Sequence, residues 1–303
     1  MGEQRAGLRA LVAVSAITLL GAAEIRAIAT DLELRPNKAH GQNFVIDPNT
    51  VRRIVRLAQV PSGTHVLEVG PGLGSLTLAL LEAGAVVRAL EIDGRLASQL
   101  QFTVHRHAPA LSGHLEVQQV DALHISAADV AGWNPKPIAL IANLPYNVAV
   151  PILLHLLSLL PELQSCLVMV QKEVAERLAA QPGTRTYGAP SAKLQWYGTC
   201  EYVGEVSRQV FWPVPNVDSA LVRITCTLPP ECSASRSEVF AIIDRAFMQR
   251  RKTLRASLAP AFGSSQACAA ALMDAQIDPE RRPETLGVVE FAQIADRCTD
   301  GIA

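Results

Sequence analysis

The sequence predicts an α/β fold in which a mainly parallel sheet carries helices on both faces and a small all-helical domain follows. From about residue 50 onward, short apolar runs alternate with stretches of helical length, as expected for strands joined by right-handed helical crossovers. A glycine-rich turn follows the first of these strands and opens a helix. The Pro/Ser-rich segment "LPPECSASRSE" (228–238) then separates this part from a C-terminal part with helical patterns only.

The spacing of apolar residues predicts the strands and helices given below in chain order. The predicted strands are 65–70, 86–91, 115–120, 137–142 and 165–171, with 200–210 and 219–227 as an antiparallel end of the sheet. The predicted helices of this part are 19–34, 75–84, 93–107, 150–160 and 172–180. The predicted C-terminal helices are 239–262, 266–276 and 288–298. The expected organisation is a tail (1–18), an α/β domain (19–228) and a helical domain (236–303).

The composition argues against several classes of protein. Of 303 residues, 49% are hydrophobic and 18% are charged, which favours a filled core over wholesale disorder. The net charge is −1, so any contact with nucleic acid must come from a local basic patch. The six cysteines include no C-x-x-C pair and no histidine partner at zinc-ligand spacing. This pattern indicates free thiols in a reducing cytosol and no metal site.

The N-terminus imitates a signal peptide. Arg5 and Arg9 precede the apolar stretch "ALVAVSAITLLGAA", which has the charge and hydropathy order of such a leader. No segment reaches the roughly 18 apolar residues that a membrane-spanning helix needs. Because the helical pattern continues through 19–34, an N-terminal helix after a loose tail is favoured over a cleaved leader. We therefore expect a cytoplasmic protein without membrane contact.

The glycine turn has an acidic partner. Gly70, Gly72 and Gly74 follow the first strand in "VLEVGPGLGSLTLALL", and glycine lets a ligand approach the backbone closely. Glu91 ends the next strand nineteen residues after Gly72, where a carboxylate can accept ribose hydroxyls. Asp121 follows the third strand and can meet an adenine edge. The G-x-G-x-G spacing fits S-adenosylmethionine (SAM) better than NAD(P). There are two alternatives to SAM binding. The loop could bind NAD(P), or the glycines could form a tight strand–helix turn that binds no ligand.

The fourth strand runs into Asn143-Leu144-Pro145-Tyr146. Because proline pushes the preceding residue into an extended conformation, Leu144 can present its carbonyl beside the Asn143 amide. Two adjacent acceptors suit the two donors of an exocyclic NH2 group, and Tyr146 offers a flat face on which a base can stack. The alternative is a turn at the end of the strand, with Tyr146 packed in the core.

Basic residues gather in one predicted C-terminal helix. They are Arg245, Arg250, Arg251, Lys252 and Arg255, with only Asp244 opposing them. On a helix they would form a basic face suited to phosphates, although an ordinary solvated face has the same composition. A second candidate patch near the expected ligand entrance consists of Lys38, His40, Arg52 and Arg53.

Together these motifs resemble one family. Asn-Leu-Pro-Tyr is similar to the signature of methyltransferases that act on the amino nitrogen of adenine. The whole chain from about residue 20 to residue 298 resembles the ribosomal RNA adenine dimethyltransferases. The motifs that carry this resemblance are, in order, "GQNFVID" (41–47), "EVGPGLGSLT" (68–77), "MVQKEVAERL" (169–178), "TYGAPSA" (186–192), "FWPVPNVDSALVRI" (211–224), "FMQRRKTLRASL" (247–258) and "RRPETL" (281–286).

The resemblance implies a Rossmann-like, SAM-dependent methyltransferase sheet with a C-terminal RNA-binding domain. The implied activity is transfer of methyl groups from SAM to two adjacent adenosines near the 3′ end of small-subunit (16S) rRNA, in a 30S particle or its precursor. The sequence shows no coiled-coil pattern and no obvious apolar patch, which favours a monomer. The implied cofactor contacts are Asn43, Val45, Gly70, Gly72, Glu91, Asp121 and Asn143. The implied contacts to the target adenine are Asn143, the Leu144 carbonyl, and the rings of Tyr146 and Phe211 as a sandwich. The implied rRNA contacts are Arg250, Arg251, Lys252 and Arg255.

Three positions depart from the family pattern. Val45 stands where leucine is common, and Asn216 and Ala256 stand where lysine and asparagine are common; the last two would weaken RNA contact slightly. A 23S rRNA methyltransferase of the macrolide-resistance type shares the catalytic half and is one alternative. A ribosome-assembly factor with incidental catalysis is another, and an NAD-dependent oxidoreductase leaves Asn-Leu-Pro-Tyr unexplained. "QRRKTLR" (249–255) and "RRPETL" favour the small-subunit activity.

Overall fold

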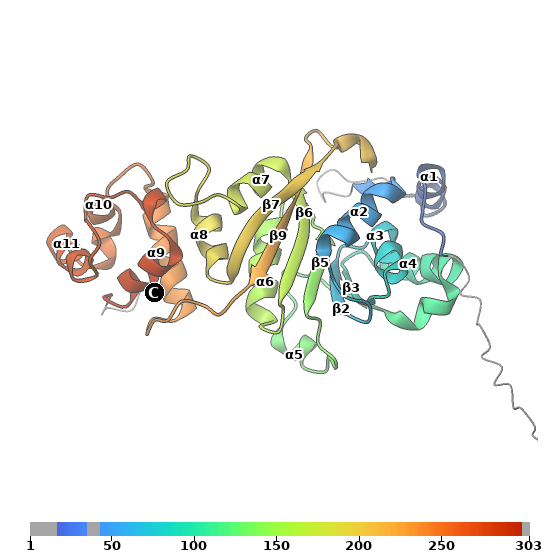
Figure 1. Ribbon diagram of the computed structural model, residues 1–303, viewed down its shortest axis with the longest axis horizontal. Helices are drawn as coiled ribbons and strands as arrows, with labels where there is room; N and C mark the ends of the chain where they lie inside the picture. Colours follow the sequence, from blue (N-terminus) through green and yellow to red (C-terminus); the bar gives the residue numbers. More distant parts are fainter. Residues whose placement is uncertain (1–16, 35–42, 299–303) are drawn as a thin grey trace, which may run out of the picture.

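The protein is built around one large twisted sheet (Figure 1). The computed structural model describes residues 17–34 and 43–298. The sheet has seven strands in the order β4-β3-β2-β5-β6-β9-β7. The first five are parallel, and β9 pairs antiparallel with both β6 and β7. The strands are β2 (His65–Val69), β3 (Val86–Glu91), β4 (Leu115–Gln119), β5 (Ala139–Asn143), β6 (Ser165–Gln171), β7 (Gly198–Val206) and β9 (Ser219–Cys226). The predicted α/β fold class and the antiparallel end of the sheet are confirmed.

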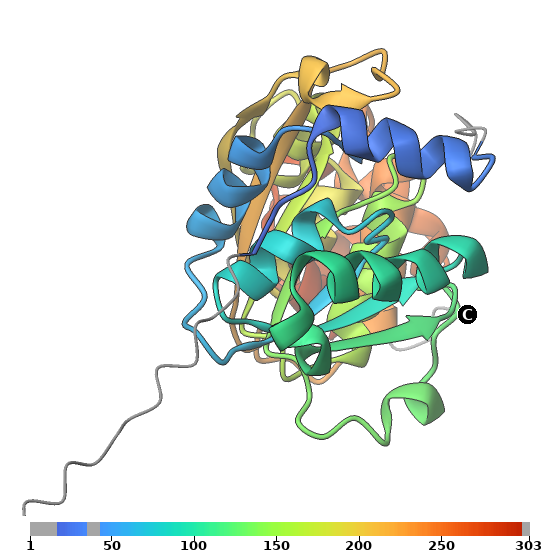
Figure 2. The same cartoon turned by 90° about the vertical axis from the view of Figure 1, so that its right-hand side faces the viewer.

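Helices bury both faces of this sheet. The helices of the α/β part are α1 (Ala22–Asp31), α2 (Pro48–Ala58), α3 (Ser75–Glu82), α4 (Gly94–His107), α5 (Ala127–Val130), α6 (Ala149–Leu159), α7 (Lys172–Leu178) and α8 (Ala189–Gln195). Figure 2 shows the blue and cyan helices of the N-terminal half in front of the strands. In β2, Val66 joins the hydrophobic cluster under α1 to α4, and Leu67 joins the cluster under α5 to α7. Because the central strands β2, β5 and β6 are buried on both faces, they read as nearly continuous apolar runs.

The spacing of apolar residues in the sequence does not predict three helices of this part, which are α2, α5 and α8. The start of α2 nevertheless has a local signal. The Asp47 side chain accepts the amide N–H groups of Asn49 and Thr50, and Pro48 occupies the first turn, where its missing donor costs nothing. Val51 and Ile54 of α2 are buried against the sheet. The cap and the proline, more than the apolar period, mark this helix in the sequence.

A second, two-stranded sheet lies beside the main one and is not foreseen by the sequence. β1 (Phe44–Val45) pairs antiparallel with β8 (Phe211–Trp212). The Ile46 amide also donates to the carbonyl of Val210 at 2.8 Å. The hydroxyl of Ser75 donates to the carbonyl of Val45 at 2.8 Å, which ties β1 to the first turn of α3. These contacts hold the N-terminal segment against the glycine turn, and they bring together two parts of the chain that are far apart in sequence.

The C-terminal part is helical, as predicted, but its first helix is broken. The helices are α9 (Arg236–Met248), α10 (Leu254–Leu258), α11 (Ser265–Asp274) and α12 (Val288–Ala295). The prediction of one helix over 239–262 is therefore wrong. The chain turns over residues 249–253, and the amides of Leu254 and Arg255 donate to the carbonyls of Arg281 and Pro279. These bonds replace the helical bonds that a continuous α9 would make.

The predicted linker has no regular secondary structure over residues 227–234, but packing crosses it. Tyr187, Ala192 and Trp196, around α8, share one buried cluster with Ile243 and Phe291 of the C-terminal helices. The two parts are thus joined by a common hydrophobic core as well as by the chain. Within residues 17–34 and 43–298, every helix is too short or too polar to cross a lipid bilayer.

Candidate active site

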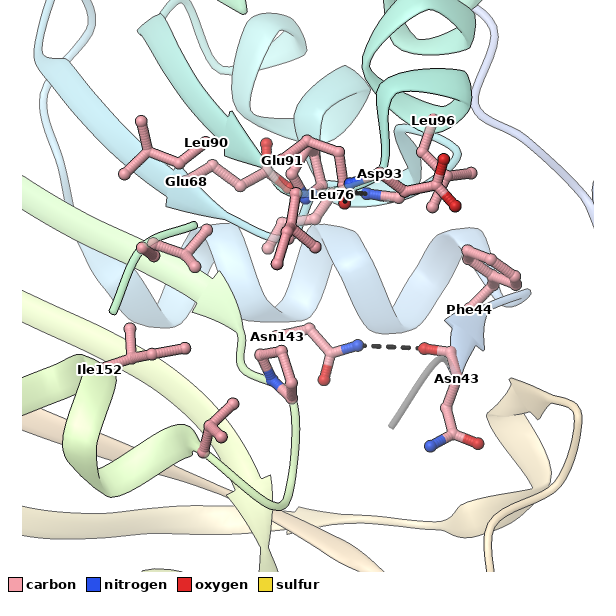
Figure 3. Close-up of a pocket in the computed structure, with 18 of the residues that line it drawn as sticks. Asn43, Phe44, Glu68, Leu76, Leu90, Glu91, Asp93, Leu96, Asn143 and Ile152 are labelled. Carbon is pink, nitrogen blue, oxygen red and sulfur yellow. Dashed lines mark hydrogen bonds between the residues drawn. The ribbon is translucent and has the colours of Figure 1, made fainter. Parts of the chain in front are cut away.

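A cavity of about 520 Å³ opens at the carboxyl ends of β2, β3, β4 and β5 (Figure 3). This edge is where open parallel sheets bind ligands, and the volume is in the range of small-molecule sites. All seven residues predicted to contact a cofactor line the cavity. They are Asn43, Val45, Gly70, Gly72, Glu91, Asp121 and Asn143. The fold therefore brings these side chains together, and their individual binding roles stay predictions.

The glycine turn is bonded directly to its acidic partner. The Gly72 amide donates to Oε2 of Glu91 at 3.1 Å, and the Asp93 amide donates to Oε1 at 3.0 Å. Burial raises the pKa of Glu91, and the two backbone donors oppose this effect. Gly72 has a positive φ of 58°, and a Cβ there would lie 2.9 Å from the Phe44 ring. Only glycine lets β1 lie this close over the turn.

A buried acid in the cavity wall, Glu68, was missed by the sequence analysis. Glu68 is the fourth of the five residues of β2, is 1% exposed, and lines the same cavity. Its Oε2 accepts a hydrogen bond from the Thr77 hydroxyl at 2.7 Å. Desolvation, partly offset by Thr77 and reinforced by the nearby Glu91, raises the pKa of Glu68 to about 8. The signal was present in the sequence, because a glutamate inside the apolar run "HVLEVG" needs an explanation.

Asp121 is fixed by its own loop. Its Oδ1 accepts the Leu123 amide at 2.9 Å, and its Oδ2 lies 2.8 Å from Nδ1 of His124. The backbone donor, followed by His124, lowers the pKa of Asp121. The group is therefore a stable carboxylate acceptor at the mouth of the cavity.

The side-chain amide of Asn143 lines the cavity, and within the part of the chain that the structure describes only its nitrogen forms a hydrogen bond. Its Nδ2 donates to the Asn43 carbonyl at 3.2 Å, a bond drawn in Figure 3. Its Oδ1 is buried and has no hydrogen-bond partner among the described residues. A buried acceptor left unpaired costs about 1–3 kcal/mol. An N–H donor of a bound molecule would remove that cost, so this oxygen marks the position of a donor group.

The other three residues predicted to contact the target base lie outside the cavity lining. The amide of Leu144 donates to the Met169 carbonyl at 3.1 Å. The Tyr146 ring is partly buried, and its hydroxyl lies 2.6 Å from the hydroxyl of Ser219. Phe211 is 1% exposed and is held in β8. The sandwich of a base between Tyr146 and Phe211 therefore stays a prediction that requires the Phe211 side chain to move.

The predicted basic residues are not one helical face. Arg250, Arg251 and Lys252 lie in the turn between α9 and α10. Arg250 donates to the Arg185 carbonyl at 2.6 Å, and Arg255 forms an ion pair with Glu280 at 3.2 Å. The side chains of Arg251 and Lys252 are exposed. The expectation of a single basic helix is wrong, because the turn over residues 249–253 places Arg250, Arg251 and Lys252 outside both α9 and α10.

In the second predicted basic patch, the two arginines already have partners within the protein. Arg52 is paired with Glu82 at 2.8 Å, and Arg53 donates to the Glu205 carbonyl at 2.8 Å. Lys38 and His40 lie outside the described residues.

The fold is similar to that of known enzymes. A dimethyladenosine transferase from Plasmodium falciparum has a TM-score of 0.68 and 26% identity, over 82% of this chain and 94% of that one. The 23S rRNA methyltransferase ErmE has a TM-score of 0.62 and 25% identity, over 84% and 99% of the two chains. The fold and the cavity at the carboxyl ends of its strands define a methyltransferase of the Rossmann-like class.

The family can be named more narrowly. The family model "Ribosomal RNA adenine dimethylase" matches residues 34–300, and the chain belongs to that family. Ribosomal RNA small subunit methyltransferase A of Thermobifida fusca is 58% identical over 278 residues, which cover 92% of this chain and 96% of the relative. The protein of the same name from Streptomyces coelicolor is 54% identical over 279 residues, 92% and 96% of the two chains.

Proposed function

We propose that the protein transfers methyl groups from SAM to the amino nitrogen of two adjacent adenosines near the 3′ end of 16S rRNA. The proposed substrate is a 30S particle or its precursor. The proposed location of the reaction is the cytoplasm, and the proposed active species is a monomer. The observation that carries the proposal is the buried, unpaired Oδ1 of Asn143 at the end of β5. An adenine amino group has the N–H donor that this acceptor lacks.

The residues around the cavity fit SAM. Glu91 keeps free lone pairs on both carboxylate oxygens, although each already accepts one backbone N–H, so it can accept ribose hydroxyls. Asp121 would meet the adenine of the cofactor, and Asn43 and Val45 would close over it from β1. Gly70 and Gly72 leave room for the amino-acid end. When bound, SAM supplies a methyl group activated by its sulfonium.

The chain's own contribution to catalysis is positioning. Asn143 Oδ1 would accept one N–H of the target amino group, and the Leu144 carbonyl would accept the other. Such bonds hold the nitrogen in place and favour its pyramidal form, whose lone pair is available for attack. Orientation of this kind supplies up to about 7–11 kcal/mol. No strong base is needed, because the nitrogen can lose its proton after transfer.

The target base must leave its stack to reach the cavity, which costs a few kcal/mol. Stacking on the Tyr146 ring would return about 1–3 kcal/mol. The ring lies at the end of the loop that carries Asn143, so one segment, 143–146, both clamps the amino group and supports the base.

The test is transfer of tritiated methyl groups from SAM to 30S particles that lack the modification, with 50S particles in parallel. We expect N6,N6-dimethyladenosine in 16S rRNA and no label in 23S rRNA. Asn143→Ala should abolish transfer, while Asn49→Ala, at an exposed position of α2, should leave it unchanged. A folded protein that labels only 50S particles, or labels neither, contradicts the proposal.

A further inference from the structure

The loop of residues 181–186, between α7 and α8, is clamped to the C-terminal helices. Figure 1 shows this loop extending toward them. Nη2 of Arg250 donates to the Arg185 carbonyl at 2.6 Å, and the Gly183 amide donates to the Glu284 carbonyl at 2.6 Å. Just after the loop, the Tyr187 hydroxyl donates to the Leu286 carbonyl at 2.9 Å. The position of the loop is thus set by two C-terminal segments, the turn 249–253 and the segment 281–286.

This clamp creates a positive surface that spans both parts of the protein. Arg185 in the loop and Arg251 and Lys252 in the turn are all exposed. None of these three forms an ion pair with a carboxylate of the described residues. The acid Glu280 nearby is already paired with Arg255 at 3.2 Å. Unpaired cations that share one surface attract polyanions, and a phosphodiester backbone is the polyanion that the proposed substrate supplies.

Arg250 has a different part in this surface. Nη2 of its guanidinium donates a hydrogen bond to the Arg185 carbonyl in the loop. The planar guanidinium can hold several acceptors at once. The side chain therefore holds the loop in place beside the turn. The charge that reaches outward comes from Arg185, Arg251 and Lys252.

We infer that the loop 181–186 belongs to the RNA-binding surface: Arg185, Arg251 and Lys252 bind backbone phosphates of the rRNA, and Arg250 positions the loop that carries Arg185. The inference rests on the proposed function and extends it, since it places a phosphate contact in the α/β part of the protein. It also assigns no base-specific contact to these residues, so their contribution is independent of RNA sequence.

The experiment measures binding of the full-length protein to unmodified 30S particles over a range of KCl concentrations. Arg185→Ala should lower the slope of log K against log salt by about one, as expected for the loss of one phosphate contact. The KM for 30S particles should rise several-fold with kcat unchanged. Arg106→Ala, an exposed arginine of α4, removes the same charge far from this surface and should change neither. Arg185→Lys keeps the charge and should retain the wild-type slope.

The positioning role of Arg250 has its own readout. Arg250→Ala should reduce the slope in the wild-type background but have little further effect in an Arg185→Ala background, because it acts through that loop. Additive losses would instead make Arg250 an independent phosphate contact and overturn its assignment.

Three outcomes separate this inference from the proposed function. If Arg185→Ala matches Arg106→Ala in slope and KM while methyl transfer persists, the loop is outside the interface and the inference fails alone. If the slope changes with 30S particles but not with protein-free 16S rRNA, the partner is a ribosomal protein and the assignment to RNA phosphates fails. If wild-type protein transfers no methyl group, the proposed function fails, and the salt slopes still decide whether the loop binds RNA.

Discussion

The substitution Glu68→Gln tests whether the buried acid in the cavity wall is protonated at neutral pH. Glu68 is buried in β2, and among the described residues the Thr77 hydroxyl is the side chain that donates a hydrogen bond to it. Its pKa rises from 4.5 to about 8 in the folded protein. The folded state therefore holds this proton more tightly than the unfolded state. As pH rises from about 4.5 to about 8, the unfolded chain releases the proton first, and the free energy of unfolding falls.

The size of the effect follows from the difference between the two pKa values. A difference of about 3.5 corresponds to at most roughly 5 kcal/mol. Glutamine is neutral at every pH and still offers an oxygen to Thr77. The variant and the wild type should thus have similar stability near pH 5, and the variant should be more stable near pH 8.5, by several kcal/mol.

The assay is urea unfolding followed by circular dichroism at a series of pH values, with unchanged m-values as the sign of an unchanged transition. Glu176→Gln, at an exposed position of α7, is the matched control and should not reproduce the gain in stability near pH 8.5. Stability curves of wild type and Glu68→Gln that run parallel between about pH 5 and about pH 8.5 would refute the reasoning.

The remaining predictions concern the site and the sheet. Ser219→Ala should raise the KM for 30S particles about two- to tenfold through loss of one hydrogen bond to Tyr146, and Tyr146→Phe should add little to it; fully additive effects would exclude the pairing. Glu91→Ala should weaken SAM binding by about tenfold or more in calorimetry while 30S binding persists; equal affinities would remove Glu91 from the ribose site. Gly198→Ala should destabilise the protein by about 3 kcal/mol or more, because its Cβ would collide with a backbone carbonyl of β9. Gly113→Ala, with nothing within 4 Å of the added carbon, should stay within about 0.5 kcal/mol of wild type in the same urea titration.

Much of the site could be predicted from the sequence because parallel strands end at one common edge. Gly72, Glu91, Asp121 and Asn143 each follow a different apolar run, and the alternation with helices makes those runs parallel. Their convergence on one cavity then follows from the topology and needs no knowledge of side-chain contacts. The hydrogen bond from the Gly72 amide to Glu91 is the direct contact that this spacing anticipates.

Other features are invisible in the local pattern. The two-residue strands β1 and β8 are too short to show a period, and their partners are distant in the chain, so their pairing depends on the completed fold. The break between α9 and α10 lies within a pattern that continues as a helix, and only the acceptors at Pro279 and Arg281 explain it.

The sequence by itself determined the strands of the main sheet, their largely parallel arrangement, most of the helices packed on them, and the polar residues that end those strands, because period and spacing are properties of neighbouring residues. Only the tertiary structure decided that Glu68 is desolvated, that Phe211 is enclosed in the core, and that Arg250 holds a loop. These three properties depend on which distant atoms surround a side chain. This environment exists only after residues that are far apart in the sequence have packed together.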